Sequence, residues 1–571
     1  MSSQRPLGEA LESTIPYHRW LPISLVVLAG ALALLPAVIF GIPTNNDLPN
    51  HYHFALPFYE SIAGGDFYPG WLASSNQGYG DPLFRFYPPG LYYLLALTRS
   101  LTGEWYTASL TVFTLLSILG SLGAYFWASS FLPRNIALWA GIFYAFMPYH
   151  VAEIYQAAQI AEFAAGAALL FALGFTKRVC QHRRWRDVAG LAASYGMLIL
   201  THLPLAVFGS IAILAYALLS ITANSKRETL LKLASAGGLG LAITSFYWTT
   251  VVAEMKWIVG DGSQPNPLLD YRANFIFSTF SPEKNVTIWW MNILTIVTLV
   301  MCLPAVALLS KRLLRSGRRD VGSVAVLMIV SLVMATGLSK PVWAAIPYLQ
   351  MAQHPFRWLA VMSTVVPILM AATMPLWLKT FRGQKRFIAL AMAGLVLISV
   401  TFTASQVIRA ARYLSRSEFE QIIRPLNESP SIVQWLPVWA SAASQGKPSY
   451  EKIPPLRNSA QVEAGQRSVG VVSWQALKRT FQVDPGEEIE ARIRTLYFPH
   501  WVAVGNGQAL ATRPAADGAL LVSLPAEAVT VSLEFREPGR TRVFAVISAI
   551  CWTLLCLLLI FGSFNRMRRE H

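Results

Sequence analysis

The chain has 571 residues, of which 54% are hydrophobic and 13% are charged, and its formal net charge is +16. A soluble chain of this length carries roughly 25% charged residues, so the composition excludes an ordinary soluble protein. Repeated apolar runs near the ~20-residue length needed to cross a bilayer indicate a multi-pass membrane protein.

The positive charge lies in short loops between apolar runs. Cytoplasmic loops of membrane proteins carry an excess of Lys and Arg, so we place these loops in the cytoplasm. They are loop-sized and lack interleaved aromatic residues, which argues against nucleic acid as a partner. The four cysteines offer neither a disulfide framework nor a CxxC metal site. The basic segments are 177–186, 225–232, 311–319, 379–386 and 566–570.

This charge pattern predicts a cytoplasmic N-terminus at 1–20 and about twelve spans with both chain ends inside. One of the short segments 188–201 and 203–221 could instead be re-entrant. A further apolar run, 88–103, is either another span or an amphipathic helix in the membrane interface, and the charge rule favours the helix. The predicted spans are 21–41, 105–131, 136–150, 160–176, 188–201, 203–221, 233–252, 287–309, 321–338, 357–378, 387–404 and 542–563.

Three polar segments then face the non-cytoplasmic side: a first loop at 42–104, a second at about 253–286, and a longer segment at 405–541. The last contains alternating runs at 488–498 and 519–535, broken by Pro and Gly, which predict a small antiparallel β domain. The expected fold class is therefore mainly α. It is a polytopic helical membrane bundle at 21–404 with a C-terminal extracytoplasmic β domain at 405–541 and a final span with a basic tail at 542–571.

The stretch "NNDLPNHYHF" (45–54) brings Asp47, His51 and His53 to the point where the first span emerges. Asp47 could cap the helix that follows, because Asp is a favoured N-cap residue. The two histidines could simply be polar tips at the interface. Alternatively, a carboxylate in this place could act as a general base or hold a divalent cation.

Further ionisable residues lie near the predicted outer ends of later spans. A charged group at the centre of a membrane helix costs about 2.5–3.5 kcal/mol, so we expect these residues to share one wet cavity. The carboxylates could bind a metal, while the cations could bind a phosphate. Structural alternatives are a snorkelling Arg357, a core His202 and a hydrogen-bonding Glu162. The residues are Arg85, Glu153, Glu162, His202, Lys340, His354 and Arg357.

Several phrases, in order, resemble the GT-C superfamily of membrane glycosyltransferases. Within it, the chain looks most like the bacterial and archaeal membrane proteins described as 6-pyruvoyl-tetrahydropterin-synthase-related or YfhO-type. The resemblance covers nearly the whole chain. It departs from the family at "QAAQ" (156–159), where Arg-Gly often stands, and at His354 and Phe356, which replace Phe and Trp. The phrases are "DLPNH" (47–51), "YGDPLFRFYPPGLYYLLAL" (79–97), "AEF" (161–163), "THLP" (201–204), 339–359, "WLPVW" (435–439) and "YFPHWVAVGNGQ" (497–508).

The resemblance implies an inverting hexosyl or pentosyl transfer from a polyprenyl-phosphate donor to a glycan, lipid or protein acceptor, outside a bacterial inner membrane. Asp47 would be the base or a metal-linked carboxylate, with Mg or Mn as the possible ion, although the first loop lacks the paired acids of several GT-C families. His51 and Glu162 would assist it. Substrate-binding residues would be Arg85, Glu153, His202, Lys340, His354 and Arg357.

Two other functions remain open from the sequence. A glycan or lipid transporter or flippase would also use twelve spans, but one half of the chain does not repeat in the other, as transporter folds often show. A catalytically silent scaffold that presents its β domain to envelope partners is the third possibility, and the missing second acid favours it.

Overall fold

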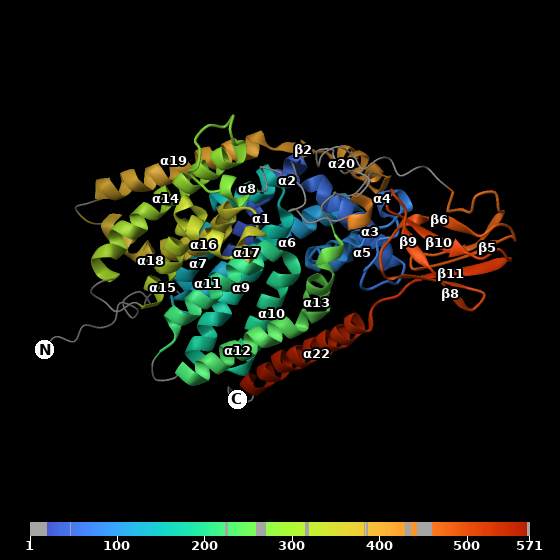
Figure 1. The fold of residues 1–571 in the computed structure, drawn as a ribbon. Coiled ribbons are helices and arrows are strands. Elements are labelled where there is room, and N and C mark those ends of the chain that lie inside the picture. Colours follow the sequence, from blue (N-terminus) through green and yellow to red (C-terminus); the bar gives the residue numbers. More distant parts are fainter. Residues whose placement is uncertain are drawn as a thin grey trace.

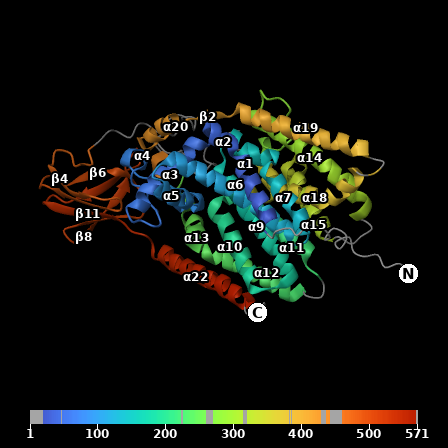
Figure 2. The same ribbon diagram turned by 180° about the vertical axis from the view of Figure 1, so that it is seen from behind.

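The computed structural model describes residues 20–45, 47–222, 226–258, 270–313, 319–381, 383, 386–428, 436–441 and 460–567. Most of the predicted cytoplasmic N-terminus and part of the second outer loop lie outside the described residues. Figures 1 and 2 show a bundle of helices with a β sandwich at one end. The predicted fold class, a helical membrane bundle with a C-terminal β domain, is confirmed.

Each predicted span overlaps a helix of the bundle. The first is broken at Leu34, where Pro36 occupies the first turn of the second piece. The span near 233–252 is a pair of helices bent by 71°. The helices are α1 (Leu21–Ala33), α2 (Leu35–Phe40), α6 (Trp105–Ser129), α7 (Arg134–Ala145), α9 (Ile160–His182), α10 (Trp185–Thr201), α11 (Leu203–Ser220), α12 (Lys226–Ile243), α13 (Ser245–Glu254), α14 (Val286–Leu313), α15 (Arg319–Ala335), α18 (Trp358–Phe381), α19 (Arg386–Ala410) and α22 (Gly539–Met567).

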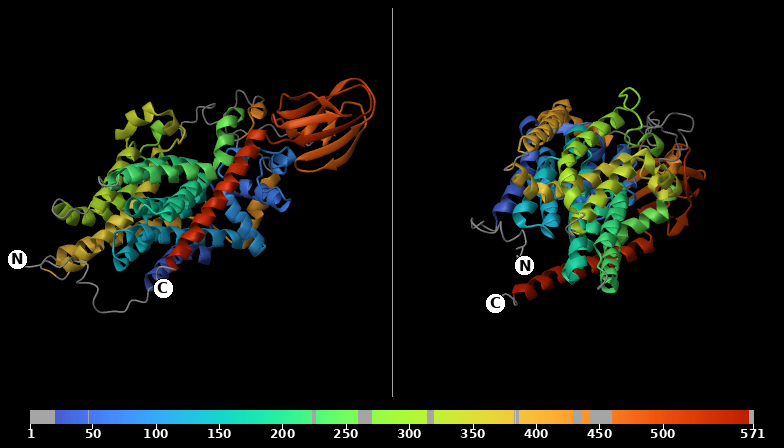
Figure 3. Two further views of the ribbon diagram at one scale, coloured as in Figure 1. Left: turned by 90° about the horizontal axis from the view of Figure 1, so that it is seen from below. Right: turned by 90° about the vertical axis from the view of Figure 1, so that its left-hand side faces the viewer.

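Six of these helices are individually long and apolar enough to cross a membrane, or seven if the bent pair counts as one span. This is fewer than the twelve predicted crossings, because α1, α7, α10 and α15 are only 12 to 17 residues long, and the apolar part of α14 among the described residues, Val286–Cys302, is also short. The helices α19 and α22 expose nearly all of their apolar side chains. Figure 3 shows α22 leaving the sandwich and running along the outside of the bundle, where it packs on α10, α12 and α13.

Short helices cover the end of the bundle that carries the sandwich. The apolar run at 88–103 forms α5, which is 13 residues long and buries Leu91 and Leu95 while exposing Leu97 and Leu101. This length is too short for a span and agrees with an interfacial helix. The others are α3 (Leu48–Ala63), α4 (Ser75–Gly78), α8 (Pro148–Ala152), α16 (Lys340–Ala345), α17 (Pro347–Gln350), α20 (Arg416–Ile423) and α21 (Val438–Ser441). Single-turn or π-helical pieces are η2 (Leu83–Arg85), η3 (Glu153–Ala157), η5 (Met255–Trp257), η7 (Tyr271–Ala273), η8 (Gly337–Ser339), η9 (Pro355–Arg357) and η10 (Arg424–Glu428).

The C-terminal domain consists of two antiparallel sheets, with strand orders β3-β6-β10-β9 and β4-β5-β11-β7-β8. Alternate residues of β11, such as Val531 and Leu533, point into the core, as the period-two pattern predicts. The strands are β3 (Val462–Glu463), β4 (Val469–Trp474), β5 (Lys478–Val483), β6 (Ile489–Leu496), β7 (Trp501–Gly505), β8 (Gln508–Leu510), β9 (Thr512–Pro514), β10 (Ala519–Leu524) and β11 (Val529–Phe535).

The described part of the segment before these strands contains no strand of the sandwich, although Leu436 and Ala440 pack in its core. The helix α19 continues to Ala410, and the strand β2 (Arg412–Leu414) then pairs with β1 (Ile42–Thr44) from the first loop. Part of "WLPVW" lies outside the described residues, and its end starts the helix α21 rather than a strand. Among the described residues, the strands of the sandwich lie at 462–535, within the predicted domain at 405–541.

The first loop completes the core of the sandwich. Trp71 is fully buried there, with its ring centroid 5.5 Å from that of Trp501. The backbone carbonyl of Tyr79 accepts hydrogen bonds from the Leu496 amide (2.7 Å) and the Thr495 hydroxyl (3.1 Å). The sandwich therefore depends on the first loop for part of its core, and it holds that loop over the end of the bundle.

Candidate functional site

Asp47 lies between β1 and α3, at the end of the bundle that carries the sandwich. Although it occupies the N-cap position of α3, its side chain makes no capping hydrogen bond. Burial raises the pKa of the Asp47 carboxyl, and the nearby positive charge of Arg357 opposes this shift. The capping role considered from the sequence is therefore absent, and Asp47 lies within electrostatic range of Arg357.

Arg357 forms an ion pair with Glu162 in the first turn of α9. The Nε atom of Arg357 is 3.0 Å from Oε2 of Glu162, whose side chain is only 1% exposed. The other carboxylate oxygen, Oε1, accepts a hydrogen bond of 2.8 Å from the hydroxyl of Tyr149 on α8. Glu162 is thus held on both sides, and it fixes the guanidinium at the start of α18.

A second buried acid, Glu153, follows on from α8. Its carboxylate lies 3.3 Å from Nδ1 of His150. Burial raises the pKa of Glu153 well above its usual range, the negative charge of Glu162 raises it further, and Arg357 opposes the shift. Glu153 and Glu162 therefore both interact with the charge of the Arg357 guanidinium. Between these two acids, η3 ends at Ala158 in a left-handed conformation (φ 54°), and α9 begins after it.

Three histidines lie around the same guanidinium. His202 caps α11 by accepting a hydrogen bond of 3.3 Å from the Leu205 amide. Burial lowers the pKa of His202 well below its usual range, and the positive charge of Arg357 lowers it further. The structure thus brings together most of the residues predicted from the sequence: Asp47, His51, Glu153, Glu162, His202, His354 and Arg357.

Lys340 and Arg85 are not part of this polar cluster. Lys340 is exposed on α16, with its Nζ atom 5.9 Å from the centroid of the Phe275 ring. Arg85 is fully buried, and its guanidinium is held by two carboxylates, so it has no free donor face for a substrate. Burial and pairing give Arg85 a structural role in place of the substrate-binding role predicted for it.

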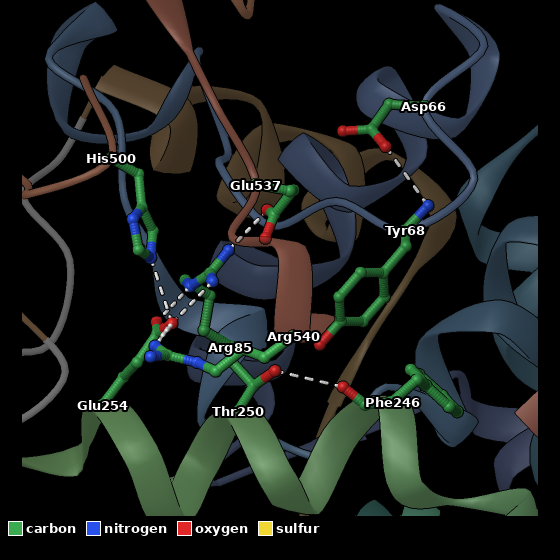
Figure 4. Close-up of polar contacts among 9 residues, drawn as sticks. All are labelled: Asp66, Tyr68, Arg85, Phe246, Thr250, Glu254, His500, Glu537 and Arg540. Carbon is green, nitrogen blue, oxygen red and sulfur yellow. Dashed lines mark hydrogen bonds and ion pairs between the residues drawn. The ribbon is translucent and has the colours of Figure 1, made fainter. Parts of the chain in front are cut away.

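Arg85 belongs to an ionic network between the bundle and the sandwich (Figure 4). Its Nε and Nη2 atoms donate to the two oxygens of Glu254 at 2.6 and 2.9 Å. Glu254, at the end of α13, also accepts from Arg540 of α22 at 2.6 Å and lies 3.0 Å from Nε2 of His500 in the sandwich. On the other side, Arg85 pairs with Glu537. One fully buried carboxylate therefore joins the first loop, α13, the sandwich and the last helix.

Replacing Glu254 with alanine is expected to lower the thermal stability of the full-length protein by about 3–5 kcal/mol, because it leaves the Arg85 guanidinium buried and short of an acceptor. The measurement is thermal unfolding of the purified protein followed by tryptophan fluorescence. Glu104→Ala is the matched control, since Glu104 forms a partly exposed pair with Arg416 that is worth about 0–1 kcal/mol. Equal shifts for the two variants would contradict the role assigned to Glu254.

The buried tyrosines of the polar cluster were not predicted from the sequence. Tyr92 is 1% exposed, and its hydroxyl lies 2.9 Å from Nδ1 of His51. Its neighbour Tyr93 donates to the carbonyl of Phe67 at 2.6 Å, away from the cluster. The repeated tyrosines of "FYPPGLYY" (86–93) were the available signal.

The residues present do not fit a metal centre. Among the described residues, no group of three or more His, Cys, Asp or Glu side chains could hold an ion. The Glu162 carboxylate is instead paired with Arg357 and Tyr149. The cation that faces Asp47 in this structure is a guanidinium.

An apolar groove of about 800 Å³ opens between α1, α2, α7, α14, α18 and α19. Its wall includes Phe143, Met301, Trp377 and Ile408. It also includes Val151, which lies between His150 and Glu153 in sequence. The groove is thus apolar, and it reaches α8, directly before the segment that carries Glu153.

These features define a polytopic helical membrane protein with a β sandwich fixed to one end and a buried polar cluster beneath it. The chain belongs to the family of membrane proteins described as 6-pyruvoyl-tetrahydropterin synthase related, whose sequence model matches residues 84–412. The matched range includes Glu162 and Arg357, while Asp47 precedes it. No curated protein sequence matches the chain.

Solved structures with a similar arrangement include two membrane enzymes. The apo oligosaccharyltransferase of Archaeoglobus fulgidus aligns with a TM-score of 0.44 and 12% identity over 70% of this chain, which spans 57% of that enzyme. ArnT of Cupriavidus metallidurans, bound to undecaprenyl phosphate, aligns with a TM-score of 0.41 and 14% identity over 74% of this chain and 78% of its own. Similarity at this level does not transfer the activity of either enzyme to this chain.

Proposed function

We propose that the protein is a GT-C-type membrane glycosyltransferase, which transfers a sugar from a polyprenyl-phosphate-linked donor to an acceptor outside the cytoplasmic membrane. The observation that carries the proposal is the buried cluster in which Arg357 lies 3.0 Å from Glu162 and opposes the raised pKa of Asp47, together with an apolar groove that reaches Val151. A donor of this kind needs an apolar channel for its tail and a cation for its phosphate.

In this proposal two side chains of the polar cluster, Asp47 and Arg357, have separate roles in the reaction. Asp47 accepts the proton of an acceptor hydroxyl, whose oxygen attacks the anomeric carbon through an oxocarbenium-like transition state. The bond from that carbon to the phosphate oxygen breaks, and its electron pair leaves with the phosphate. Arg357 stabilises the developing charge, while Glu162 and Tyr149 keep the guanidinium in place. A single displacement of this kind inverts the anomeric carbon.

Transfer is expected to continue in the presence of a chelator, because Arg357 supplies positive charge near Asp47 and the described residues include no group of three or more side chains that could hold a metal ion. The measurement is the transfer rate of the reconstituted protein before and after incubation with EDTA, with rates expected to agree within about twofold. Loss of activity that Mg²⁺ or Mn²⁺ restores would contradict this expectation and return Asp47 to the metal-linked role.

The transfer rate is expected to fall as the pH is lowered. The midpoint of this fall should lie above the usual Asp pKa of about 3.9. Burial raises the pKa of Asp47, and only the ionised carboxylate can accept a proton, so activity is present above this raised pKa and lost below it. A pH profile of the rate, with circular dichroism to verify folding at each point, measures the shift. A rate that stays constant down to about pH 4 would exclude Asp47 as the base.

The proposal is tested by reconstituting the purified protein in vesicles with polyprenyl-phosphate-linked sugars on the side of the sandwich. A glycosyltransferase releases free polyprenyl phosphate and lengthens the acceptor. A flippase moves the intact donor across the bilayer and releases none. A protein that does neither with a panel of hexosyl and pentosyl donors would support the scaffold function.

A further inference from the structure

The segment between α15 and α18 exposes a group of large apolar side chains. It consists of η8, α16 and α17, in which η8 packs on α15 and α16, and α16 packs on α17 (Figure 1). A contiguous apolar surface of this kind marks an interaction site, whereas single exposed apolar residues need no explanation. Five side chains, each between 41% and 78% exposed, form what we call the apolar face: Leu338, Val342, Ile346, Tyr348 and Met351.

The opposite side of the same segment is fixed to the bundle. Trp343 is fully buried, its ring is stacked on that of Tyr271 at 5.8 Å between centroids, and its Nε1 atom donates to the carbonyl of Met334 at 3.3 Å. The side-chain amide of Gln350 donates to the carbonyl of Trp343 at 3.0 Å, which joins α17 to α16. Leu349 is buried as well. The segment is therefore amphipathic, with one side packed on the protein and the apolar face turned outward.

The apolar face continues the exposed apolar side of α15. Val326, Ile329 and Val333 are all exposed, and their spacing of three and four residues puts them on one side of the helix. Because α15 is a helix of the membrane bundle, apolar side chains that it exposes contact lipid. Leu338 follows directly after α15 ends at Ala335. The lipid-facing surface of the bundle thus extends past the end of α15 onto the short helices.

The residue types of the segment also suit the membrane interface. Between Gly337 and Phe356, Lys340 is the one residue that is Lys, Arg, Asp or Glu. It is exposed, and its long apolar stem lets the ammonium group reach lipid headgroups while the backbone lies deeper. Tyr348 is a residue type enriched at this depth, where the ring is in apolar surroundings and the hydroxyl is near water.

We propose that η8, α16 and α17 form an interfacial anchor, whose apolar face lies in the lipid leaflet on the side of the sandwich. The partner is the lipid surface itself. An amphipathic segment of this kind lies in the plane of the interface, with its apolar side buried about 5–10 Å into the boundary between headgroups and acyl chains. The inference concerns a membrane contact, so it holds whether or not the protein transfers a sugar.

The test measures where nitroxide spin labels on the apolar face lie in the full-length protein, reconstituted in vesicles of phosphatidylcholine and phosphatidylglycerol. Labels are attached to Leu338→Cys and Tyr348→Cys, whose side chains are exposed, so that little packing is lost. Two reference sites are exposed to nearly the same extent: Val546→Cys on the apolar helix α22 (58%) and Val472→Cys on β4 of the sandwich (60%). The native cysteines, which are first replaced by alanine, are Cys180, Cys302, Cys551 and Cys556.

Each label is exposed to oxygen, which concentrates in hydrocarbon, and to nickel-EDDA, which stays in water. The ratio of the two accessibilities at positions 338 and 348 is expected to match that at 546 and to exceed that at 472 several-fold. A ratio equal to that at 472 would place the apolar face in water and overturn the proposal. Low access to both reagents would show that protein covers the face, which would also overturn it.

A substitution within the apolar face tests whether its apolar character holds the segment in the membrane. With the label at position 338, Tyr348→Asp is expected to raise nickel-EDDA access, because a carboxylate is costly in hydrocarbon. Tyr348→Leu is the matched control and should leave the access unchanged. Equal access in the two variants would show that α15 and α18 alone hold the segment in place, and it would overturn the role of the apolar face as an anchor.

Discussion

Replacing Asp47 with asparagine is expected to reduce sugar transfer by about 10²–10⁴-fold, the usual contribution of a positioned general base. The amide has nearly the same shape as the carboxylate but cannot accept the acceptor proton. Because Asp47 makes no capping hydrogen bond, the substitution removes no structural contact of that kind. Expression and unfolding temperature should therefore remain close to wild type, and donor binding should persist.

The matched control is Asp66→Asn, which changes another carboxylate of the first loop. Asp66 accepts a hydrogen bond of 3.2 Å from the Tyr68 amide, and Figure 4 shows it among the residues around the ionic network. The assay is release of polyprenyl phosphate from the lipid-linked donor under single-turnover conditions. Rates for Asp47→Asn and Asp66→Asn that agree with each other would remove Asp47 from the mechanism.

Replacing Arg357 with alanine is expected to raise the donor concentration required for half-maximal transfer by about 10- to 100-fold, because a hydrogen bond to a charged group is worth about 1.5–3 kcal/mol. The maximal rate should also fall, since the leaving phosphate loses its cation. The acceptor dependence should change little. Arg416→Ala is the control, because Arg416 is an exposed cation that pairs with Glu104 outside the cluster.

Loss of Arg357 also leaves Glu162 buried without its cation, which can destabilise the fold and obscure the effect on binding. The double variant Arg357→Ala with Glu162→Gln separates the two effects. It removes the unpaired carboxylate while Tyr149 retains a side-chain acceptor. We expect the unfolding temperature to recover in the double variant and the donor requirement to stay high. Recovery of both would show that Arg357 acts only by balancing Glu162.

The membrane helices and the strands could be predicted from the sequence because both depend on local patterns. Apolar runs and basic loops placed every span on a helix, and two alternating runs marked β6, β10 and β11. Local patterns did not show that α19 extends to Ala410 or that β2 pairs with β1, since the polar residues there resemble those of any outer segment. Strand pairing over a long sequence separation is decided by packing.

The residue types of the polar cluster were also apparent in the sequence, because ionisable groups at membrane depth are costly and stand out against apolar runs. The sequence did not show which of these residues lie close to one another. Arg85 and Arg357 follow aromatic residues in similar outer segments, yet one is enclosed by Glu254 and Glu537 and the other faces Asp47. Tyr92 is a residue type that often lies at the membrane interface, yet in the structure it is buried against His51.

The sequence by itself determined that the chain crosses a membrane several times, carries a β domain near its C-terminus and holds acids, imidazoles and cations near one end of its helices. Only the tertiary structure decided that Asp47 and Arg357 share a cluster, that Arg85 fixes the sandwich to the bundle, and that Trp71 lies in the sandwich core. The reason is physical: hydrophobic periodicity reports whether a side chain is buried, whereas its partner depends on how distant segments pack.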